Sequence, residues 1–281
     1  MTCAFHRQST IALTAAERTG STMADLSWAS DFGSNVGGDL VGGALAFAFG
    51  YFARGAVTLQ QHRKFESFWG AGCRSGTEKV SVVMGVYHDP RPATGNRYVK
   101  TLSTGQAIPL VGGQEVGSVA EGRAASYLSS ALAKHRSIPP GVSSDEDVVA
   151  QWDGTFLCLG SGDSNEKSRV ILDLNENEFC DFWQGNVRSK WDDKTYPIQQ
   201  NPPRDRALIV KLRNPWMEGH SLVVCAGLAE PGTAGAAYYL ARNWQRLHRR
   251  YGKSPFGIVL EVDWSSDQTA REIANSPPGH S

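Results

Sequence analysis

Two glycine-rich segments follow apolar runs and carry residue types that could bind a small anion. The first, Gly160 to Asn165, lies between the run Thr155–Leu159 and a helix predicted over Ser164–Leu174. Glycines let the backbone approach a ligand closely, and the free amides at a helix start can hold phosphate. Its candidate ligand-binding residues are Gly160, Ser161, Ser164 and Asn165. The structural alternative is that Ser164 or Asn165 caps the helix and the glycines only make the turn.

The second segment, Gly227 to Ala237, again joins an apolar run to a helix, which we predict over Gly232–Tyr251. Its candidate ligand-binding residues are Gly227, Gly232 and Thr233. In a doubly wound sheet both segments would fall at the edge formed by the carboxyl ends of the strands, where ligands bind. The first segment matches neither a dinucleotide fingerprint, nor a Walker loop, nor a nucleophile elbow.

Catalysis is an alternative use of the first segment. Asp163 or Glu166 would then act as a general base on a bound nucleotide. A serine–histidine–acid set can also be drawn from Ser161 or Ser164, His220 or His248, and Asp263, as it can from almost any chain of this size. The 7 histidines include no HExxH and no paired ligand spacing, so we expect no zinc site. The sequence identifies no cofactor.

Basic residues gather near the end of the last long predicted helix and on a nearby strand. They are Arg242, Arg246, His248, Arg249 and Arg250 on the helix, and Lys211 and Arg213 on the strand. Anionic ligands or acidic lipid headgroups would suit this charge. We interpret it as a solvated helix face, with cations near the end that the helix dipole favours.

Strand and helix signals alternate beyond Gly76. Strands are predicted at residues 79–87, 155–159, 178–183, 207–212, 221–226 and 256–262, and helices at 116–135, 164–174 and 232–251. Strands that are apolar along their whole length require a sheet covered on both faces. We therefore predict an α/β fold for residues 78–264: a Rossmann-like, doubly wound, mostly parallel sheet with helices on both faces.

Residues 36–57 form an apolar stretch about as long as the bilayer core, which predicts an N-terminal transmembrane helix. The basic residues after it place the carboxyl-terminal domain in the cytoplasm. Asp39 favours the alternative, a buried glycine-rich helix or loop. We expect residues 1–35 and 265–281 to be disordered and 58–77 to be a juxtamembrane linker. Within that linker, three aromatic residues are either an interfacial cluster or the edge of the domain core: Phe65, Phe68 and Trp69.

The composition narrows the classes of partner. Hydrophobic residues make up 41% of the chain and the formal net charge is zero, so we expect a sizeable core and no nucleic-acid partner. The 5 cysteines are odd in number and form no CxxC, which is typical of free thiols in a reducing compartment. Three glycines at helical spacing in the predicted span, Gly38, Gly42 and Gly43, would permit helix packing in a homo-oligomer.

Three short motifs resemble a loosely defined group of uncharacterised prokaryotic membrane-anchored Rossmann-like domain proteins. They are Gly160-Ser161-Gly162-Asp163-Ser164-Asn165, Leu212-Arg213-Asn214-Pro215, and the set Gly227, Gly232, Thr233, Ala236 and Ala237. The resemblance covers roughly residues 36–262. It implies a membrane-tethered Rossmann-like domain, and no established activity comes with it.

These observations lead to one hypothesis and two alternatives. The hypothesis is a membrane-anchored cytosolic binding or sensor domain for a small anionic ligand, which fold analogy suggests to be nucleotide-derived. The first alternative is a nucleotide hydrolase or nucleosidase-like enzyme that uses Asp163 or Glu166. The second is a soluble structural or interaction scaffold without a small ligand, in which both glycine segments are only tight turns.

Overall fold

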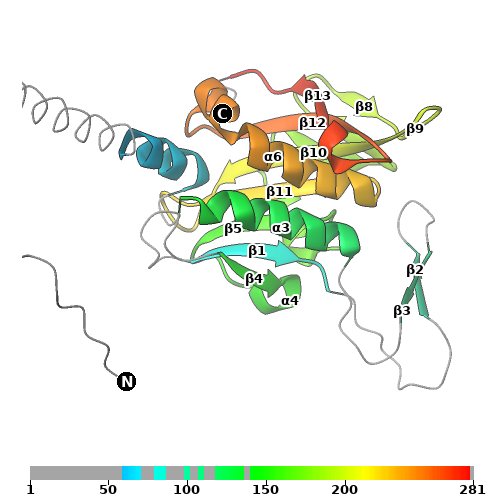
Figure 1. Cartoon of the computed structure of the whole chain (residues 1–281), viewed down its shortest axis with the longest axis horizontal. Coiled ribbons are helices and arrows are strands. Elements are labelled where there is room, and N and C mark those ends of the chain that lie inside the picture. The colour runs from blue at the N-terminus through cyan, green and yellow to red at the C-terminus, as the bar shows by residue number, and fades with distance from the viewer. Residues whose placement is uncertain are drawn as a thin grey trace, which may run out of the picture. The chain divides into compact units, whose positions relative to one another are not determined.

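Eight strands of one sheet organise the part of the chain that the structure describes. The structure is a computed structural model and describes residues 59–70, 79–86, 98–101, 107–110, 118–135 and 140–278, all within the unit Val57–Ser281. The strands follow the order β13-β12-β10-β11-β5-β1-β4, and β9 pairs with β10 off this path (Figure 1). Their bounds are β1 Val80–Met84, β4 Gly141–Ser144, β5 Thr155–Leu159, β9 Gln199–Gln200, β10 Pro203–Arg213, β11 Ser221–Gly227, β12 Phe256–Asp263 and β13 Arg271–Asn275.

The directions of these strands correct the predicted fold. Strands β4, β1, β5 and β11 pair in parallel. Strand β10 is antiparallel to β11, β12 and β9, and β12 is antiparallel to β13. The sheet is thus mixed, with more antiparallel than parallel pairings. The prediction of a mostly parallel, doubly wound Rossmann-like sheet was wrong.

The reason lies in the connection between β10 and β11. Only the short segment Asn214–His220 joins them, whereas a parallel return needs about a dozen residues or more. The apolar runs in both strands misled the prediction because they report only that both faces of the sheet are covered. They carry no information on strand direction.

The prediction of a transmembrane helix also finds no support. No helix in the described ranges is long and apolar enough to cross a membrane. The predicted span at residues 36–57 lies outside the described residues, as does the N-terminal segment 1–35.

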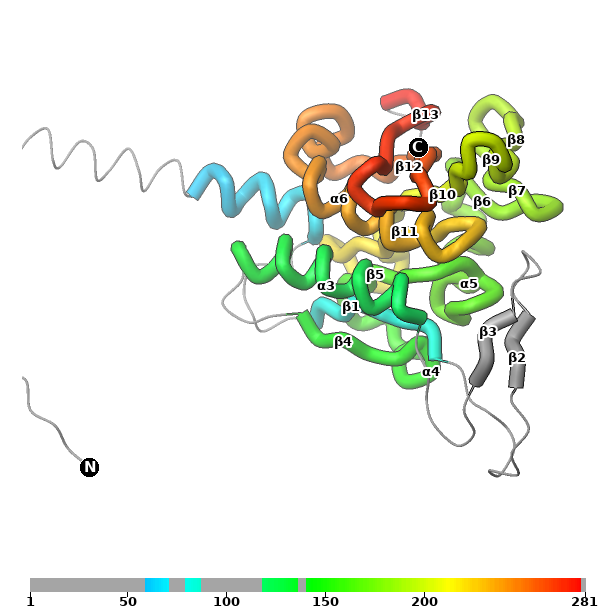
Figure 2. Tube along the Cα trace, turned by 45° about the vertical axis from the view of Figure 1, so that its right-hand side comes forward, coloured from blue at the N-terminus to red at the C-terminus, as the bar shows by residue number. Residues whose placement is uncertain are grey.

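Two layers cover the sheet, one on each face (Figures 1 and 2). The first contains α3 (Val119–Ala133), α6 (Glu230–Tyr251) and the helix of residues 59–69. The second contains α5 (Glu166–Leu172) and a small sheet of β6 (Cys180–Trp183), β7 (Asn186–Ser189) and β8 (Lys194–Tyr196). Strand β10 serves both cores by alternation: Ala207 and Ile209 face the first layer, and Leu208 and Val210 face the second.

Shorter elements complete the described chain. Helix α4 (Asp145–Val148) follows β4, and β2 (Tyr98–Thr101) pairs with β3 (Ala107–Leu110) in a separate two-stranded sheet. The segment after Ser265, expected to be disordered, contains the 3-10 turn η1 (Asp267–Thr269) and β13. Its sequence is polar because β13 is the edge of the sheet and exposes much of its surface.

The helix of residues 59–69 belongs to the core of the domain. Its aromatic side chains Phe65, Phe68 and Trp69 are 0–1% exposed. Phe68 stacks on Phe256 of β12, with ring centroids 6.0 Å apart, and Phe65 meets Trp244 of α6 edge-on at 5.3 Å. Of the two interpretations left open by the sequence, the structure therefore favours the edge of the core over a membrane interface.

We predict that Phe68→Ala destabilises the full chain by about 3–5 kcal/mol, because it opens a cavity where helix, α6 and β12 meet. Urea unfolding followed by circular dichroism measures the change. The matched control is Leu59→Ala on the same helix, where a side chain 47% exposed should change stability by less than about 0.5 kcal/mol. Equal effects of the two substitutions would show that the helix is not docked as described.

Candidate functional site

The structure brings the two predicted loops to one edge of the sheet. Strands β5 and β11 are parallel neighbours, with Leu159 opposite Cys225. Just beyond them, the amide of Gly160 donates to the carbonyl of Cys225 at 3.0 Å. The segments Gly160–Asn165 and Gly227–Thr233 therefore start side by side, as expected from their place after two parallel strands.

The loop between β11 and α6 is already occupied by a carboxylate of the protein. Asp205, at the start of β10, is completely buried and accepts hydrogen bonds from the amides of Gly232 at 2.7 Å and Ala229 at 3.0 Å. It also accepts from the amide of Arg206 at 2.7 Å. The free amides at the start of α6, which the sequence assigns to a bound anion, thus hold Asp205.

The glycines of this loop are explained by close backbone packing. A Cβ atom at Gly232 would clash with the Asp205 carboxylate and would lie 2.8 Å from the Cα of Gly227. Thr233 is buried, and its hydroxyl accepts from the amide of Gly227 at 3.0 Å. Gly227 therefore packs against both Thr233 and Gly232, and Gly232 in turn contacts Asp205.

The loop between β5 and α5 is held in a similar way. Asn165 is fully buried, and its side-chain amide donates to the carbonyls of Val83 at 3.1 Å and Leu159 at 2.9 Å. Its side-chain oxygen caps α5 through the amide of Ser168 at 2.9 Å. Asn165 therefore ties β1 to β5 and starts α5, which is the structural alternative that the sequence left open. The hydroxyl of Ser164 donates to the carbonyl of Ser161 at 3.1 Å.

Two further carboxylates take up amides at this edge. Glu121 of α3 is 3% exposed and accepts from the amide of Gly85 at 2.8 Å. A Cβ at Gly160, whose φ is +91°, would collide with the same carboxylate. Asp145 accepts from the amides of Val86 at 3.0 Å and Glu166 at 2.7 Å. Binding of an external anion at the predicted residues stays a prediction, and these internal carboxylates already use many of the amide donors that it would need.

The residues suggested for catalysis are not set up as a general base. Glu166 pairs with Arg169, whose Nε lies 2.9 Å from Oε2, and this hydrogen bond lowers the pKa of Glu166. A carboxylate with a lowered pKa is a weaker proton acceptor. Asp163 is exposed to solvent. Of the candidate histidines, His220 contacts Thr155 at the opposite end of β5 from Ser161, and His248 contacts Phe68 of the helix of residues 59–69.

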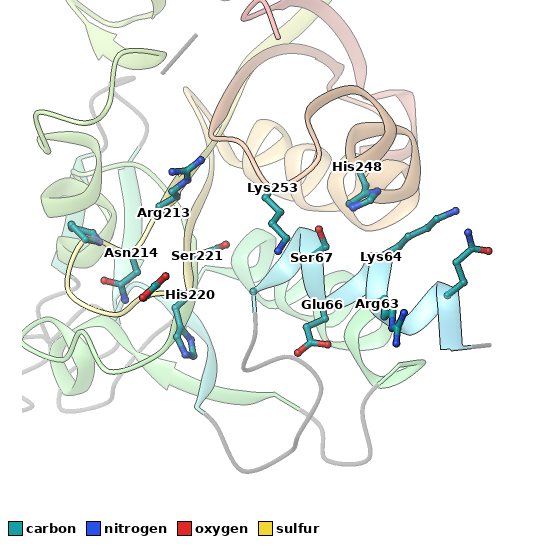
Figure 3. A pocket seen from close by; sticks show the side chains of 15 residues that line it. Arg63, Lys64, Glu66, Ser67, Arg213, Asn214, His220, Ser221, His248 and Lys253 are labelled. Carbon is teal, nitrogen blue, oxygen red and sulfur yellow. The ribbon is translucent and has the colours of Figure 1, made fainter. Parts of the chain in front are cut away.

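That opposite end of β5 carries a feature that the sequence analysis missed, a basic cleft of about 990 Å³ (Figure 3). The helix of residues 59–69 forms one wall. The ends of β10 and α6 and the connection from β10 to β11 form the rest. The charged and imidazole side chains that line it are Arg63, Lys64, Glu66, Arg213, Glu218, His220, His248 and Lys253.

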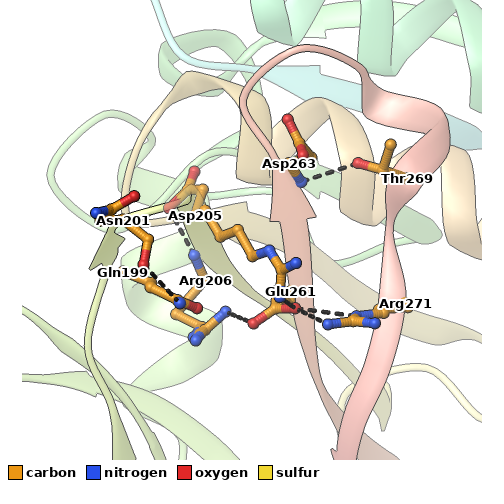
Figure 4. A network of polar contacts seen from close by, with 9 residues as sticks. Gln199, Asn201, Asp205, Arg206, Glu261, Asp263, Thr269 and Arg271 are labelled. Atoms are coloured by element: carbon orange, nitrogen blue, oxygen red, sulfur yellow. Dashed lines mark hydrogen bonds and ion pairs between the residues drawn. The ribbon is translucent and has the colours of Figure 1, made fainter.

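Four cations of this cleft have no carboxylate partner. Within the described ranges, Arg63, Lys64, Arg213 and Lys253 form no ion pair. Several arginines elsewhere on the fold do, whereas Arg242 and Arg249, which are exposed on α6, form no ion pair within the same ranges. Among the paired arginines, Arg123 contacts Asp267 at 2.9 Å. Three further arginines, Arg204, Arg206 and Arg271, all pair with the buried carboxylate of Glu261. Figure 4 shows Arg206 and Arg271 beside it.

The pKa values of two nearby groups are lowered, mainly by their burial. Burial, followed by the charges of Lys64 and Lys211, lowers the pKa of His248. Burial, followed by the charge of Arg213, lowers the pKa of Lys211 to about 8. Lys211 lies behind the cleft wall, and its ammonium donates to the carbonyl of Lys253 at 3.3 Å. The neighbouring positive charges thus add to an effect that burial dominates.

Some of the cations of the cleft were noted in the sequence but were assigned to a solvated helix face. Arg213 and His248 were part of the basic cluster interpreted as a solvated face. That interpretation holds for Arg246 and Arg250, which pair with Glu272 of β13 at 3.2 and 2.5 Å. Only the docking of the helix of residues 59–69 brings the remaining cations together. Among the residues described, no cluster of three or more His, Cys, Asp or Glu side chains could hold a metal ion.

We predict that Gly232→Ala destabilises the domain by about 1–3 kcal/mol, since the added methyl group displaces the Asp205 carboxylate from its amides. Gly122→Ala is the matched control, because a Cβ on that helical glycine meets nothing within 4 Å. It should stabilise the domain by up to about 1 kcal/mol. Urea unfolding of both variants checks the contrast, and a neutral Gly232→Ala would contradict it.

A second prediction concerns pH. Burial raises the pKa of Asp205 from an ordinary value of 3.8 to about 6. The folded protein then binds a proton more readily than the unfolded chain between these two values. The resulting stability is fully present below about pH 4 and is lost as the pH rises through about 6, by up to roughly 3 kcal/mol.

Asp205→Asn, which has the same shape but does not titrate, should lack this loss. The free energy of unfolding of wild type minus that of the variant should therefore fall between about pH 4 and about pH 7. Urea unfolding at several pH values measures it. Parallel pH profiles for the two proteins would mean that Asp205 titrates normally.

Comparison of the chain with protein-family models, with curated proteins and with solved structures finds no match.

Proposed function

We propose that this domain binds a small anionic ligand in the basic cleft between the helix of residues 59–69 and the ends of β10 and α6. One observation carries the proposal: Arg63, Lys64, Arg213 and Lys253 line one cavity without a carboxylate partner in the described part of the chain. An anion that enters the cleft gains favourable charge interactions with these solvent-exposed side chains.

The side chains of the cleft suit phosphate or carboxylate groups. Arginine offers a planar fork that binds such groups through two parallel hydrogen bonds, and lysine adds a compact charge. Glu66 and Glu218 also line the cleft, so the cationic groups outnumber the anionic ones by two. Histidines at His220 and His248 supply further polar contacts with the ligand.

The size of the cleft indicates a ligand larger than a single phosphate ion. Its volume of about 990 Å³ lies at the upper end of the range of about 300–1,000 Å³ for small-molecule sites. A nucleotide-derived ligand has the matching charge and size. The proposal keeps the ligand class of the sequence-based hypothesis and places it at the other end of β5. The unpaired charges support binding of an anion and indicate no particular reaction.

The first test is thermal unfolding of the full chain with a panel of nucleotides and dinucleotides, with inorganic phosphate and pyrophosphate as smaller probes. A ligand that binds only the folded state raises the unfolding temperature by mass action. We expect a rise with at least one nucleotide, and a smaller rise at high salt because screening weakens charge attraction. The absence of a rise across the whole panel would contradict a nucleotide ligand.

Variants then locate the site. Arg63→Ala and Arg213→Ala, from opposite walls, should each weaken binding of the best nucleotide by about tenfold or more, measured by calorimetry. Arg242→Ala is the matched control, since this exposed arginine of α6 lies outside the cleft, and it should bind like wild type. If Ser161→Ala abolished binding while both cleft variants retained it, the site would be the predicted glycine loop instead.

A further inference from the structure

A second pocket lies beyond the carboxyl end of β5, at the opposite end of that strand from the basic cleft. Its volume is about 580 Å³. The loop Ser161–Asp163 forms one side, α5 and the segment after it form another, and the hairpin of β6 and β7 forms the third. The sequence named Ser161 and Asp163 as site residues, but the proposed anion site does not use them.

The hairpin gathers three side chains at this pocket. Asp181 and Trp183 are two residues apart on β6, so they point to the same face, and Arg188 of β7 pairs across the strands with Asp181. Arg188 donates to the two Asp181 oxygens at 3.0 and 2.6 Å. Its guanidinium carbon lies 4.7 Å from the centroid of the Trp183 ring, which remains 49% exposed. A partly open aromatic surface therefore stands beside a fixed acceptor–donor pair.

The charges of this pocket balance, unlike those of the basic cleft. Three cations line it, and each has an acidic neighbour that also lines it. The ion pairs are Arg188–Asp181 at 2.6 Å, Lys190–Asp181 at 3.6 Å and Arg169–Asp173 at 3.6 Å. The third acid is Asp163. An ionic ligand would have to separate these pairs, whereas a neutral polar ligand can add to them.

Hydroxyl groups match such a lining best, because each hydroxyl both donates and accepts. Neighbouring hydroxyls can donate to the carboxylate of Asp181 and accept from the guanidinium of Arg188. The apolar face of a ring can lie on the part of the Trp183 indole that the guanidinium of Arg188 leaves exposed. We propose that this pocket binds a neutral, polyhydroxylated ring, that is, a monosaccharide or a disaccharide unit.

The test is calorimetric titration of the full chain with a panel of neutral monosaccharides and disaccharides at up to about 10 mM. We expect saturable binding of at least one sugar, with little dependence on salt because the ligand carries no charge. Lack of binding by every sugar in the panel would overturn the proposal.

Two variants place the sugar. Trp183→Ala should weaken its binding by about tenfold, and Asp181→Asn should also weaken it by removing the charged acceptor. The matched control is Trp264→Ala, a tryptophan 46% exposed outside the pocket, which should bind like wild type. Circular dichroism verifies that each variant is folded. Arg213→Ala in the basic cleft should leave sugar binding unchanged. Sugar binding that survives Trp183→Ala, or that is lost in Arg213→Ala, would overturn this site.

Discussion

The attachment of a buried carboxylate to the start of α6 fixes the geometry of much of this fold. Asp205 has no exposed surface and accepts amides from both the beginning of β10 and the first turn of α6. The helix extends about 33 Å from that point at about 1.5 Å per residue. Its far end supplies His248 and, just beyond, Lys253. A contact at one edge of the sheet therefore determines where the cleft forms at the other.

The charged groups at the two ends of β5 differ in whether they have partners within the described part of the protein. At the carboxyl end, backbone amides are satisfied by carboxylates of the chain, and exposed cations are paired with acids. At the amino end, four cations share a cavity without such partners in the described ranges. Because pairing costs side-chain freedom and desolvation, a fold satisfies charges where rigidity is needed. Charged side chains that line a cavity without an ion-pair partner are therefore stronger evidence of a ligand site than charged side chains that are already paired.

Local patterns in the sequence predicted where strands and loops lie, but they did not predict which parts of the chain contact one another. Apolar runs located β5, β10, β11 and β12, and glycine after a strand located both loops at one sheet edge. The direction of the strands could not be predicted, because a buried residue such as Val210 or Val224 packs equally well in a parallel or an antiparallel strand. Asp205 escaped notice because it stands between Arg204 and Arg206, where an acid resembles ordinary surface charge. The cleft escaped notice because its wall was predicted to be a linker outside the domain.

The helix of residues 59–69 has a second consequence beyond its packing. The helix begins at Leu59, the first described residue, and two of its side chains, Arg63 and Lys64, line the cleft. An anion that contacts these two side chains together with Arg213 and Lys253 links the helix to the sheet. By reciprocity, a force on the preceding chain that loosens the helix must lower the affinity of the cleft by the same factor by which the anion resists the loosening. Occupancy of the cleft and docking of this helix are therefore thermodynamically coupled.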